Sequence, residues 1–282
     1  MQNASEEMNV IMIHGGPSFY GYMHTLAELL PAWVVTQTYA QRGTITKPLT
    51  TDHLTMEDHF EDLDAVIRDF SKVEPVVLIG HSWGANLALL YAASRPKQIA
   101  QVVSVGPAPL TPSGAEAFGA TLMQRCAPAL VEELKDIEAA MQNLLESDGD
   151  AAELNALAER RFSLMQPSYH FDADCDARIP RIAVDFKGFL ASQAALWRLI
   201  DEGTIESRLK SIRCPVLHLH GRDDPIPAHS TGAFLQSHIE RYSSVFFDQC
   251  GHFPWLESGA SELFLEALSS SLSNVMREAR AS

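Results

Sequence analysis

In the segment "GHSWG" at residues 80–84, a serine, Ser82, stands between two glycines. Residues 76–79 before it are all apolar, which is typical of a buried strand, and residues 85–95 after it have the composition of a helix. A serine on a tight turn from a strand into a helix projects its hydroxyl above the sheet, where the hydroxyl can attack a carbonyl carbon. The N-terminus of the following helix favours the negative charge that this attack creates. The segment therefore predicts Ser82 as a nucleophile.

A serine hydroxyl becomes a good nucleophile only when a base takes its proton, and the candidate base is His252. It lies far down the chain in "GHFP" at 251–254, after another β-rich run. The acid that orients the histidine is expected between the serine and the histidine in chain order. The segment "GRDD" at 221–224 supplies two carboxylates there. Asp224 is favoured by its spacing from the glycine, and Asp223 is the alternative.

The oxyanion formed by such an attack needs preorganised donors, which are commonly two backbone N–H groups. One is expected from Trp83, the residue after the serine. The other is expected from Gly16 in "HGGP" at 14–17, because this loop follows the first predicted strand. Four aromatic side chains in these segments are predicted to line an apolar substrate pocket: Phe19, Tyr20, Trp83 and Phe253.

Short β-rich runs alternate with helical patterns, which predicts an α/β fold with a mostly parallel sheet and helices on both faces. The alternation stops after residue 109, and from 110 to 203 the apolar spacing is helical. We expect a helical cap at 110–203, inserted into a core formed by 1–109 and 204–282. Ligands bind outside the carboxyl ends of the strands in such sheets, so the cap is expected to cover the site. The predicted strands are residues 10–13, 33–39, 76–79, 102–105, 216–220 and 245–247.

Composition excludes several classes of partner and location. The 282 residues carry a net charge of −15, which excludes nucleic acid and an anionic membrane surface as partners. No apolar stretch approaches the ~18 residues that span a bilayer, and the first ten residues lack the features of a secretory signal. The four cysteines are scattered without a CxxC pair, which predicts neither a disulfide framework nor a zinc site and favours a reducing cytoplasm: Cys126, Cys175, Cys214 and Cys250.

Other histidines and cysteines are expected to be structural. His218 and His220 alternate along one predicted strand, as a pair of metal ligands would, but no carboxylate or histidine at ligand spacing joins them. His81 is expected to pack beneath the turn at Ser82, and Cys250 to be a small buried residue. We therefore predict no metal site and no cofactor.

Together these motifs resemble the α/β-hydrolase superfamily and, more narrowly, its proline iminopeptidase branch. The resemblance implies an α/β-hydrolase fold with a mostly parallel central sheet of about eight strands, flanking helices and an inserted helical cap. It carries a catalytic triad onto Ser82, Asp224 and His252, and an oxyanion hole onto Gly16 and Trp83. The matching segments are "HGGP" at 14–17, "QRG" at 41–43, "GHSWGANLALLYAASRP" at 80–96, "PVLHLHGRDDPIP" at 215–227 and "GHFPWLE" at 251–257.

The chain departs from the iminopeptidase pattern at two positions. That pattern usually reads HGGPG and DQRG, whereas Ser18 and Ala40 stand here for the last glycine and the aspartate. Arg42 is therefore expected to lack an adjacent carboxylate. Cleavage after an N-terminal proline also needs acidic cap residues that hold the free amine. The candidates for that role are Glu116, Glu132, Glu133, Glu146, Asp172, Asp174 and Asp201.

The pattern as a whole predicts a cofactor-independent serine hydrolase that cleaves a small ester or amide. Its substrate is expected to be a small molecule or a short peptide, and the protein to be a monomer or small homo-oligomer. An aminopeptidase and a carboxylesterase both fit, and a lyase or cofactor-free oxygenase on the same scaffold stays open. Ser82 argues against haloalkane dehalogenases and epoxide hydrolases, which have an aspartate there. A small-molecule-binding protein with little or no turnover is the alternative from another class.

Overall fold

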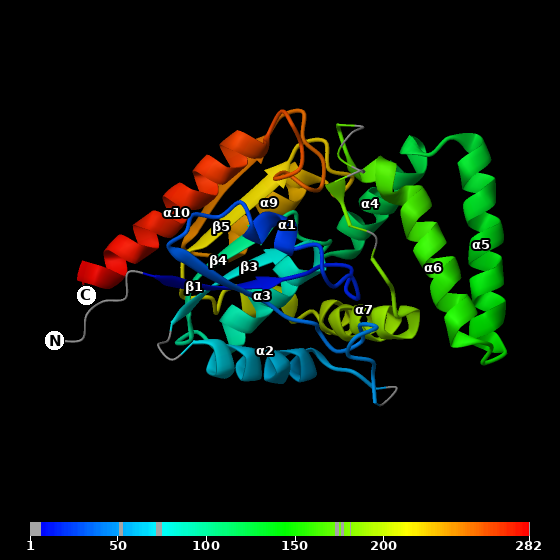
Figure 1. The fold of residues 1–282 in the computed structure, drawn as a ribbon, viewed down its shortest axis with the longest axis horizontal. Coiled ribbons are helices and arrows are strands. Elements are labelled where there is room, and N and C mark those ends of the chain that lie inside the picture. Colours follow the sequence, from blue (N-terminus) through cyan, green and yellow to red (C-terminus); the bar gives the residue numbers. More distant parts are fainter. Residues whose placement is uncertain are drawn as a thin grey trace.

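One parallel sheet of six strands forms the centre of the protein (Figure 1). The computed structural model describes residues 7–50, 53–71, 75–172, 175, 178–180 and 182–281. Residues 1–6, Asp174 and the other positions outside these ranges are not discussed further. The strands run in the order β2-β1-β3-β4-β5-β6. Their bounds are β1 (Met8–Ile13), β2 (Val34–Thr38), β3 (Val76–His81), β4 (Ile99–Val105), β5 (Val216–Gly221) and β6 (Tyr242–Phe247).

The α/β architecture and the parallel sheet are confirmed, since every described strand pair is parallel. The number of strands differs from the estimate of about eight. That estimate came from the family resemblance, whereas the β-rich runs of the sequence number six and coincide with the six described strands. Local patterning was therefore the better guide to the size of this sheet.

Helices connect the strands and continue beyond them. The helix at Met56–Phe70 begins directly after Thr55, because Thr55 forms a capping box with Asp58 there. None of the helices in the described ranges is both long and apolar enough to cross a membrane. The helices are α1 (His24–Ala27), α2 (Met56–Phe70), α3 (Trp83–Ser94), α4 (Pro112–Arg125), α5 (Pro128–Glu146), α6 (Ala151–Met165), α7 (Phe186–Asp201), α8 (Ile205–Leu209), α9 (Ala228–His238) and α10 (Ser261–Ala281), with a 3-10 turn, η1 (Gln166–Tyr169).

The core lies on both faces of the sheet, because successive side chains of a strand point to opposite sides. In β1, Ile11 and Ile13 pack with α2 and α3 on one face, and Val10 and Met12 pack with α1 and α10 on the other. All four side chains are fully buried. Burial on both faces explains why residues 10–13 of β1 and 76–79 of β3 read as unbroken apolar runs.

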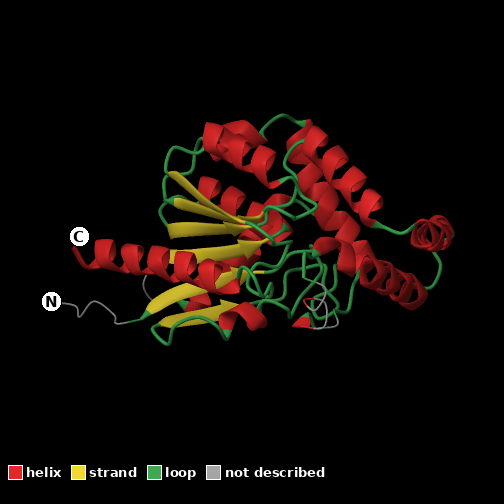
Figure 2. Ribbon diagram, turned by 90° about the horizontal axis from the view of Figure 1, so that it is seen from above, coloured by secondary structure: helices red, strands yellow, loops and turns green. Residues whose placement is uncertain are grey.

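The segment at 110–203, predicted as a cap, contains α4 to α7 and leaves the sheet after β4. Figure 2 shows these helices beyond the carboxyl ends of the strands, on the side away from both termini. Strands β1 and β3 are neighbours although β2 lies between them in sequence. The order in which strands are added to the sheet therefore switches sides between β1 and β3. Open α/β sheets bind ligands at such a switch point.

Two glycines make the turn after β3 possible. A Cβ at Gly80 would clash with the carbonyl oxygen of Gly84 and lie 2.7 Å from the Cα of Ala85. A Cβ at Gly84 would clash with the carbonyl oxygens of Ile13 and His14. These neighbours are backbone atoms that cannot rotate away, so α3 packs against β1 and β3 only when both positions lack a side chain.

We predict that Gly80→Ala will destabilise the protein by about 1–3 kcal/mol, the usual cost of forcing an extra methyl group into a packed core. The matched control is Gly119→Ala in α4, where a new Cβ meets no atom within 4 Å. That control is expected to stabilise the protein by up to about 1 kcal/mol, because alanine favours helix over glycine. Urea unfolding would measure both. Equal stability of Gly80→Ala and the native protein would contradict the proposed packing.

Candidate active site

Ser82 occupies a strained turn between β3 and α3. Its φ of 57° and ψ of −125° lie in a region that residues with a side chain rarely adopt. The backbone is held there by a 2.9 Å hydrogen bond from the Ser82 N–H to the Val105 carbonyl of β4. Ser82 also lines a cavity at the carboxyl end of the sheet. Ser82 therefore lies on a strained turn, as the sequence predicts, and it borders a cavity.

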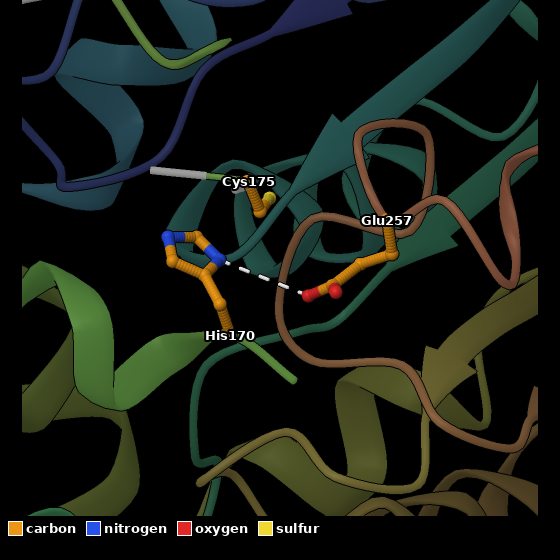
Figure 3. A group of neighbouring side chains, drawn as sticks. All are labelled: His170, Cys175 and Glu257. Atoms are coloured by element: carbon orange, nitrogen blue, oxygen red, sulfur yellow. Dashed lines mark ion pairs between the residues drawn. The ribbon is translucent and has the colours of Figure 1, made fainter. Parts of the chain in front are cut away.

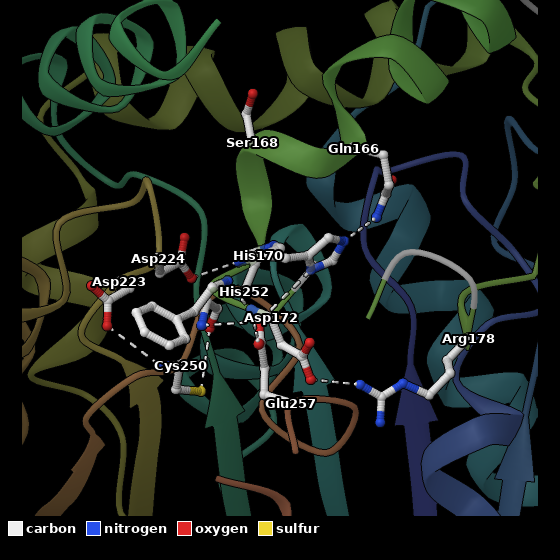
Figure 4. A network of polar contacts seen from close by, with 12 residues as sticks. Gln166, Ser168, His170, Asp172, Arg178, Asp223, Asp224, Cys250, His252 and Glu257 are labelled. Carbon is white, nitrogen blue, oxygen red and sulfur yellow. Dashed lines mark hydrogen bonds and ion pairs between the residues drawn. The ribbon is translucent and has the colours of Figure 1, made fainter. Parts of the chain in front are cut away.

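His252 and Asp224 are brought together from two separate loops (Figure 4). The His252 Nδ1 lies 2.6 Å from Asp224 Oδ2, and the Ile226 N–H donates to Asp224 Oδ1 at 2.8 Å. Asp223 points elsewhere and accepts a hydrogen bond from the Cys250 N–H at 3.3 Å. Of the two carboxylates that the sequence left open, the structure places Asp224 against the histidine.

The Asp224 carboxylate is buried and ionised. Burial alone would raise its pKa, but the neighbouring His252 and His220 imidazoles outweigh burial and lower the pKa well below its ordinary value. Gly106 lies against this pair with a φ of +48°, and a Cβ there would be 3.2 Å from both Asp224 Oδ2 and His252 Nδ1. Glycine is required at this position by the backbone conformation and by the lack of space.

A second hydrogen-bond chain holds the backbone of His252. The Gly15 N–H donates to the Tyr22 hydroxyl at 2.7 Å, and this hydroxyl lies 2.6 Å from His81 Nδ1. The His81 Nε2 lies 2.8 Å from the His252 carbonyl oxygen. Burial lowers the pKa of His81 well below its ordinary value, and nearby His252 lowers it further. The Nδ1 of a neutral His81 therefore accepts from the Tyr22 hydroxyl, and its Nε2–H donates to the His252 carbonyl oxygen. The sequence predicted only that His81 packs beneath the turn.

The two predicted oxyanion residues line the same cavity as the serine. Gly16 and Trp83 both border it. The neighbouring Gly15 N–H is already used by Tyr22, and a Cβ at Gly15 would come within 2.7 Å of the Ser82 Cβ. The glycine loop after β1 therefore runs directly beside the serine, and its backbone can approach a bound carbonyl group.

The cavity has a volume of about 540 Å³, which suits a small organic molecule. It is bordered by Ser82 and His252 at one end and by α4 to α7 elsewhere. Three of the predicted aromatic residues line it, namely Phe19, Trp83 and Phe253. Tyr20 does not: it is 37% exposed, and its ring packs edge-on against His14. Adjacent residues of a loop point in different directions, and the sequence does not reveal which one points inward.

Most of the cavity wall is apolar. The described lining residues also include an ion pair that the sequence analysis did not predict. Arg161 and Glu138 both line the cavity and pair with each other at 2.8 Å between Arg161 Nη2 and Glu138 Oε1. They lie on α6 and α5, and Glu138 is the only acidic residue among the described residues of the lining. The apolar side chains from the inserted helices include Phe118, Leu122, Met141, Phe162, Met165, Phe186 and Phe189.

Arg42 has no carboxylate adjacent in sequence, as expected, but it does have carboxylate partners elsewhere in the fold. Arg42 donates to both oxygens of Asp62, at 2.8 and 2.7 Å, and to Asp58 at 3.0 Å. Both aspartates belong to α2, so the carboxylates come from a distant helix in place of the neighbouring position 40. The other departure, Ser18, also has a partner of its own, because its hydroxyl donates to the carbonyl oxygens of Gly43 and Asp185.

A buried carboxylate links the His252 loop to the chain after η1 (Figures 3 and 4). Glu257 accepts N–H groups from Gly251 at 3.0 Å, Phe171 at 3.2 Å and Asp172 at 2.8 Å. Ligand atoms of Glu257, His170 and Cys175 all lie within 4.8 Å of one another. Since both Glu257 oxygens already accept backbone hydrogen bonds, this group fixes the loop, and we do not assign it as a metal site.

The described cysteines Cys126, Cys175, Cys214 and Cys250 are all buried and in no disulfide. His220, predicted to be structural, contacts Asp224 through a hydrogen bond, and His218 contacts His220. The contact with Asp224 was missed because the carboxylate lies four residues after His220, beyond the turn that ends β5. The alternation of two histidines directly before "GRDD" was the available signal.

A parallel sheet that carries a serine on a strained turn after β3, with a histidine–aspartate pair at the same edge, defines an α/β protein of the nucleophile-elbow class. The chain belongs to the alpha/beta hydrolase family, whose sequence model matches residues 10–266.

The individual relatives carry the names of different enzymes. The 2-hydroxymuconate semialdehyde hydrolase of Pseudomonas sp. (strain CF600) is 28% identical over 69% of this chain, and the match spans 61% of that relative. A proline iminopeptidase of Heyndrickxia coagulans is 24% identical, over 88% of this chain and 85% of its own length. These identities leave the substrate of this chain undetermined.

Solved structures share the fold. A thermophilic esterase from Thermogutta terrifontis superimposes with a TM-score of 0.69, at 17% identity, over 95% of this chain and 90% of its own. The proline iminopeptidase of Mycobacterium smegmatis gives a TM-score of 0.62, at 19% identity, over 99% of this chain and 93% of its own.

Buried neutral histidines are expected to make the protein sensitive to acid. Burial lowers the pKa of His59 to about 3, and neither ring nitrogen of His59 has a hydrogen-bond partner among the described residues. Below the unfolded pKa of about 6.5, the unfolded chain takes up a proton at His59 that the folded protein does not. The free energy of unfolding therefore falls as the pH falls, by about 1.4 kcal/mol per pH unit for this histidine.

We predict that His59→Leu will reduce this pH slope by about 1.4 kcal/mol per pH unit between pH 6 and 4. Urea unfolding across that range would measure the slope. The matched control is His229→Leu, which removes an exposed histidine. A His59→Leu slope equal to that of the native protein would show that the folded protein can be protonated at residue 59.

Proposed function

We propose that the protein is a serine hydrolase that cleaves small, largely apolar carboxylic esters. The observation that carries the proposal is that Ser82, on its strained turn, and His252, held by the buried Asp224, border the same apolar cavity. A nucleophile, a base and an orienting acid placed in this way match the arrangement of a serine hydrolase triad. The names of the relatives, which include a hydrolase, an esterase and a peptidase, support hydrolysis as the reaction class.

In the proposed reaction, the Ser82 Oγ attacks the ester carbonyl while His252 Nε2 takes its proton. Asp224 accepts the His252 Nδ1–H, which fixes the imidazole tautomer and stabilises the imidazolium. His252 then gives the proton to the leaving alcohol, and the acyl group stays on Ser82. Water attacks this acyl-enzyme with His252 again acting as base, which releases the acid and restores the serine.

The oxyanion of each tetrahedral intermediate is proposed to accept hydrogen bonds from the backbone N–H groups of Gly16 and Trp83. Trp83 follows the nucleophile and begins α3, so its N–H lies at the positive end of a helix. Gly16 has a φ of +112° and borders the cavity from the other side. We further propose that the segment at 110–203 acts as a cap that selects the substrate, since its helices supply most of the cavity wall.

An ester fits the cavity better than a peptide with a free N-terminus. A charged amine in an apolar cavity needs a carboxylate partner, since an unpaired buried charge is costly. Glu138 is the only acid among the described lining residues, and Arg161 already neutralises it. None of the six described acids predicted to hold the amine lines the cavity: Glu116, Glu132, Glu133, Glu146, Asp172 and Asp201.

An aminopeptidase is the second candidate, because a proline iminopeptidase matches 88% of this chain. In that case Glu138 would have to exchange Arg161 for the substrate amine. The negative charge of the chain still argues against nucleic acid and anionic membranes as partners. The cytoplasmic location and the state of a monomer or small homo-oligomer stay predictions from the sequence.

We expect the protein to hydrolyse p-nitrophenyl esters of short and medium acyl chains and to leave free prolyl and alanyl p-nitroanilides uncleaved. Ser82→Ala should lower kcat by on the order of 10⁴ to 10⁶ and abolish labelling by a fluorophosphonate probe. Anilides with free and blocked amines form the matched pair. Turnover of the free prolyl anilide alone would replace the ester proposal with the aminopeptidase. Saturable ester binding without labelling of Ser82 would indicate a binding protein instead.

The two neighbouring aspartates give a test of the orienting acid. Asp224→Asn should lower kcat by on the order of 10⁴, because an amide donates to His252 and favours the wrong imidazole tautomer. Asp223→Asn is the matched control and should keep kcat within roughly threefold, since Asp223 contacts only the loop beside the site. Rates on one p-nitrophenyl ester would be compared. A larger loss in Asp223→Asn than in Asp224→Asn would contradict the assignment.

A further inference from the structure

A continuous chain of hydrogen-bonding side chains runs along β5 and β6 and ends at Asp224. The Tyr242 hydroxyl lies 2.7 Å from His218 Nδ1, and His218 Nε2 lies 3.0 Å from His220 Nδ1. The His220 Nε2 lies 3.0 Å from Asp224 Oδ2, the same oxygen that contacts His252. His218 and His220 are two residues apart on β5, so their rings share one face of the sheet. Both side chains are fully buried.

The charge of Asp224 sets the direction of every bond in this chain. An ionised carboxylate only accepts, so His220 must donate from Nε2. A neutral His220 that carries its proton on Nε2 has an accepting Nδ1, which requires His218 to donate from its own Nε2. The His218 Nδ1 is then an acceptor, and Tyr242 is its donor. All ring nitrogens of the two histidines are satisfied by this single arrangement of protons.

Neutral histidines fit these surroundings. Burial lowers the pKa of His218 well below its ordinary value, and the adjacent His220 lowers it further. The four nitrogens are all used within the chain, so the two histidines have no free electron pair for a metal ion. Among the described residues, the titratable groups that interact electrostatically with Asp224 include His218, His220, His252, His81, Tyr169 and Cys250.

We propose that His220 is a positioning residue that aims the Asp224 carboxylate at His252, and that His218 and Tyr242 fix the tautomer in which His220 can donate. Asp224 Oδ1 is held by the Ile226 N–H, and Oδ2 is held from one side by His220. Rotation of the carboxylate away from His252 would break both contacts. These hydrogen bonds to Asp224 therefore take the place of the water molecules that an exposed carboxylate would bind.

This inference rests on the proposed function, because it assigns a role within the Ser82–His252–Asp224 reaction. Two donors share Asp224 Oδ2, so its negative charge is divided between His220 and His252. When His252 becomes an imidazolium, this sharing keeps the Nδ1 proton on the histidine, while the Nε2 proton passes to the leaving group. Loss of His220 should loosen the carboxylate and raise its basicity, which strengthens its attraction for the protonated form of His252.

The test compares His220→Leu, which removes the donor, with His220→Gln, whose side-chain N–H₂ can reach the position of Nε2. With a p-nitrophenyl ester, His220→Leu should lower kcat about tenfold to a hundredfold, the usual effect of one hydrogen bond to a charged group. Its KM should stay within about twofold, because His220 does not border the cavity. The acid limb of the pH profile of kcat/KM should move to higher pH. His220→Gln should restore both kcat and the native pH profile.

Equal losses in His220→Leu and His220→Gln, with the native pH profile kept in both, would overturn the proposal and leave His220 as a packing residue. If the native enzyme neither cleaves esters nor reacts with a fluorophosphonate, the proposed function fails, and NMR then tests the positioning by itself. The low-field proton of His252 Nδ1–H should be present in the native protein and in His220→Gln, and shifted or lost in His220→Leu. An unchanged resonance in His220→Leu would overturn the positioning role.

NMR of ¹⁵N-labelled histidines tests the part played by His218. His218 and His220 should both carry their proton on Nε2 in the native protein. In His218→Leu, the His220 Nδ1 loses its donor, and a mixture of tautomers is expected at His220. A native His220 protonated on Nδ1 would overturn the direction of the chain.

Discussion

The buried negative charge of Asp224 is the constraint on which the rest of the site depends. An ionised carboxylate removed from water is costly unless donors surround it. Here the Ile226 N–H, the His220 ring and the His252 ring supply those donors. The same need fixes the end of β5, the loop that carries His252 and the tautomers of three histidines. The orientation of the base toward the cavity thus follows from how one carboxylate is kept hydrogen-bonded.

The sheet and the inserted helices contribute different parts of the site. The parallel sheet places Ser82, Asp224 and His252 at one edge, because β3, β5 and β6 all end there. The helices from 110–203 form most of the cavity wall, which is apolar apart from a few polar side chains and one ion pair. Glu257 connects the two parts, since its carboxylate binds backbone N–H groups of the His252 loop and of the chain after η1. The inserted segment also contacts His252 directly, since the His252 N–H donates to the Tyr169 carbonyl oxygen at 2.8 Å.

The structure has Ser82 on the predicted turn and His252 at the same cavity, whereas sequence reasoning was incomplete at several other positions. The serine motif is local: its glycines, the strand before it and the helix after it all lie within a short segment. Asp223 and Asp224 are neighbours on a turn, where one residue of difference reverses the direction of a side chain. The sequence showed that Arg42 lacks an adjacent carboxylate, but it did not show that two carboxylates of α2 take its place. Tyr20 does not line the cavity. Its residue type alone does not indicate the direction of its side chain.

The sequence by itself determined the approximate positions of the six described strands and the turn that carries Ser82, because each depends on spacing within a short segment of the chain. It also limited the acid to two adjacent residues. The tertiary structure decided which carboxylate meets His252, which aromatic residues face the cavity and how Glu138 and Arg161 neutralise each other. It alone joined Tyr242, His218 and His220 to Asp224. These features depend on contacts between segments far apart in the chain, and such contacts are set by the packing of strands and helices as a whole.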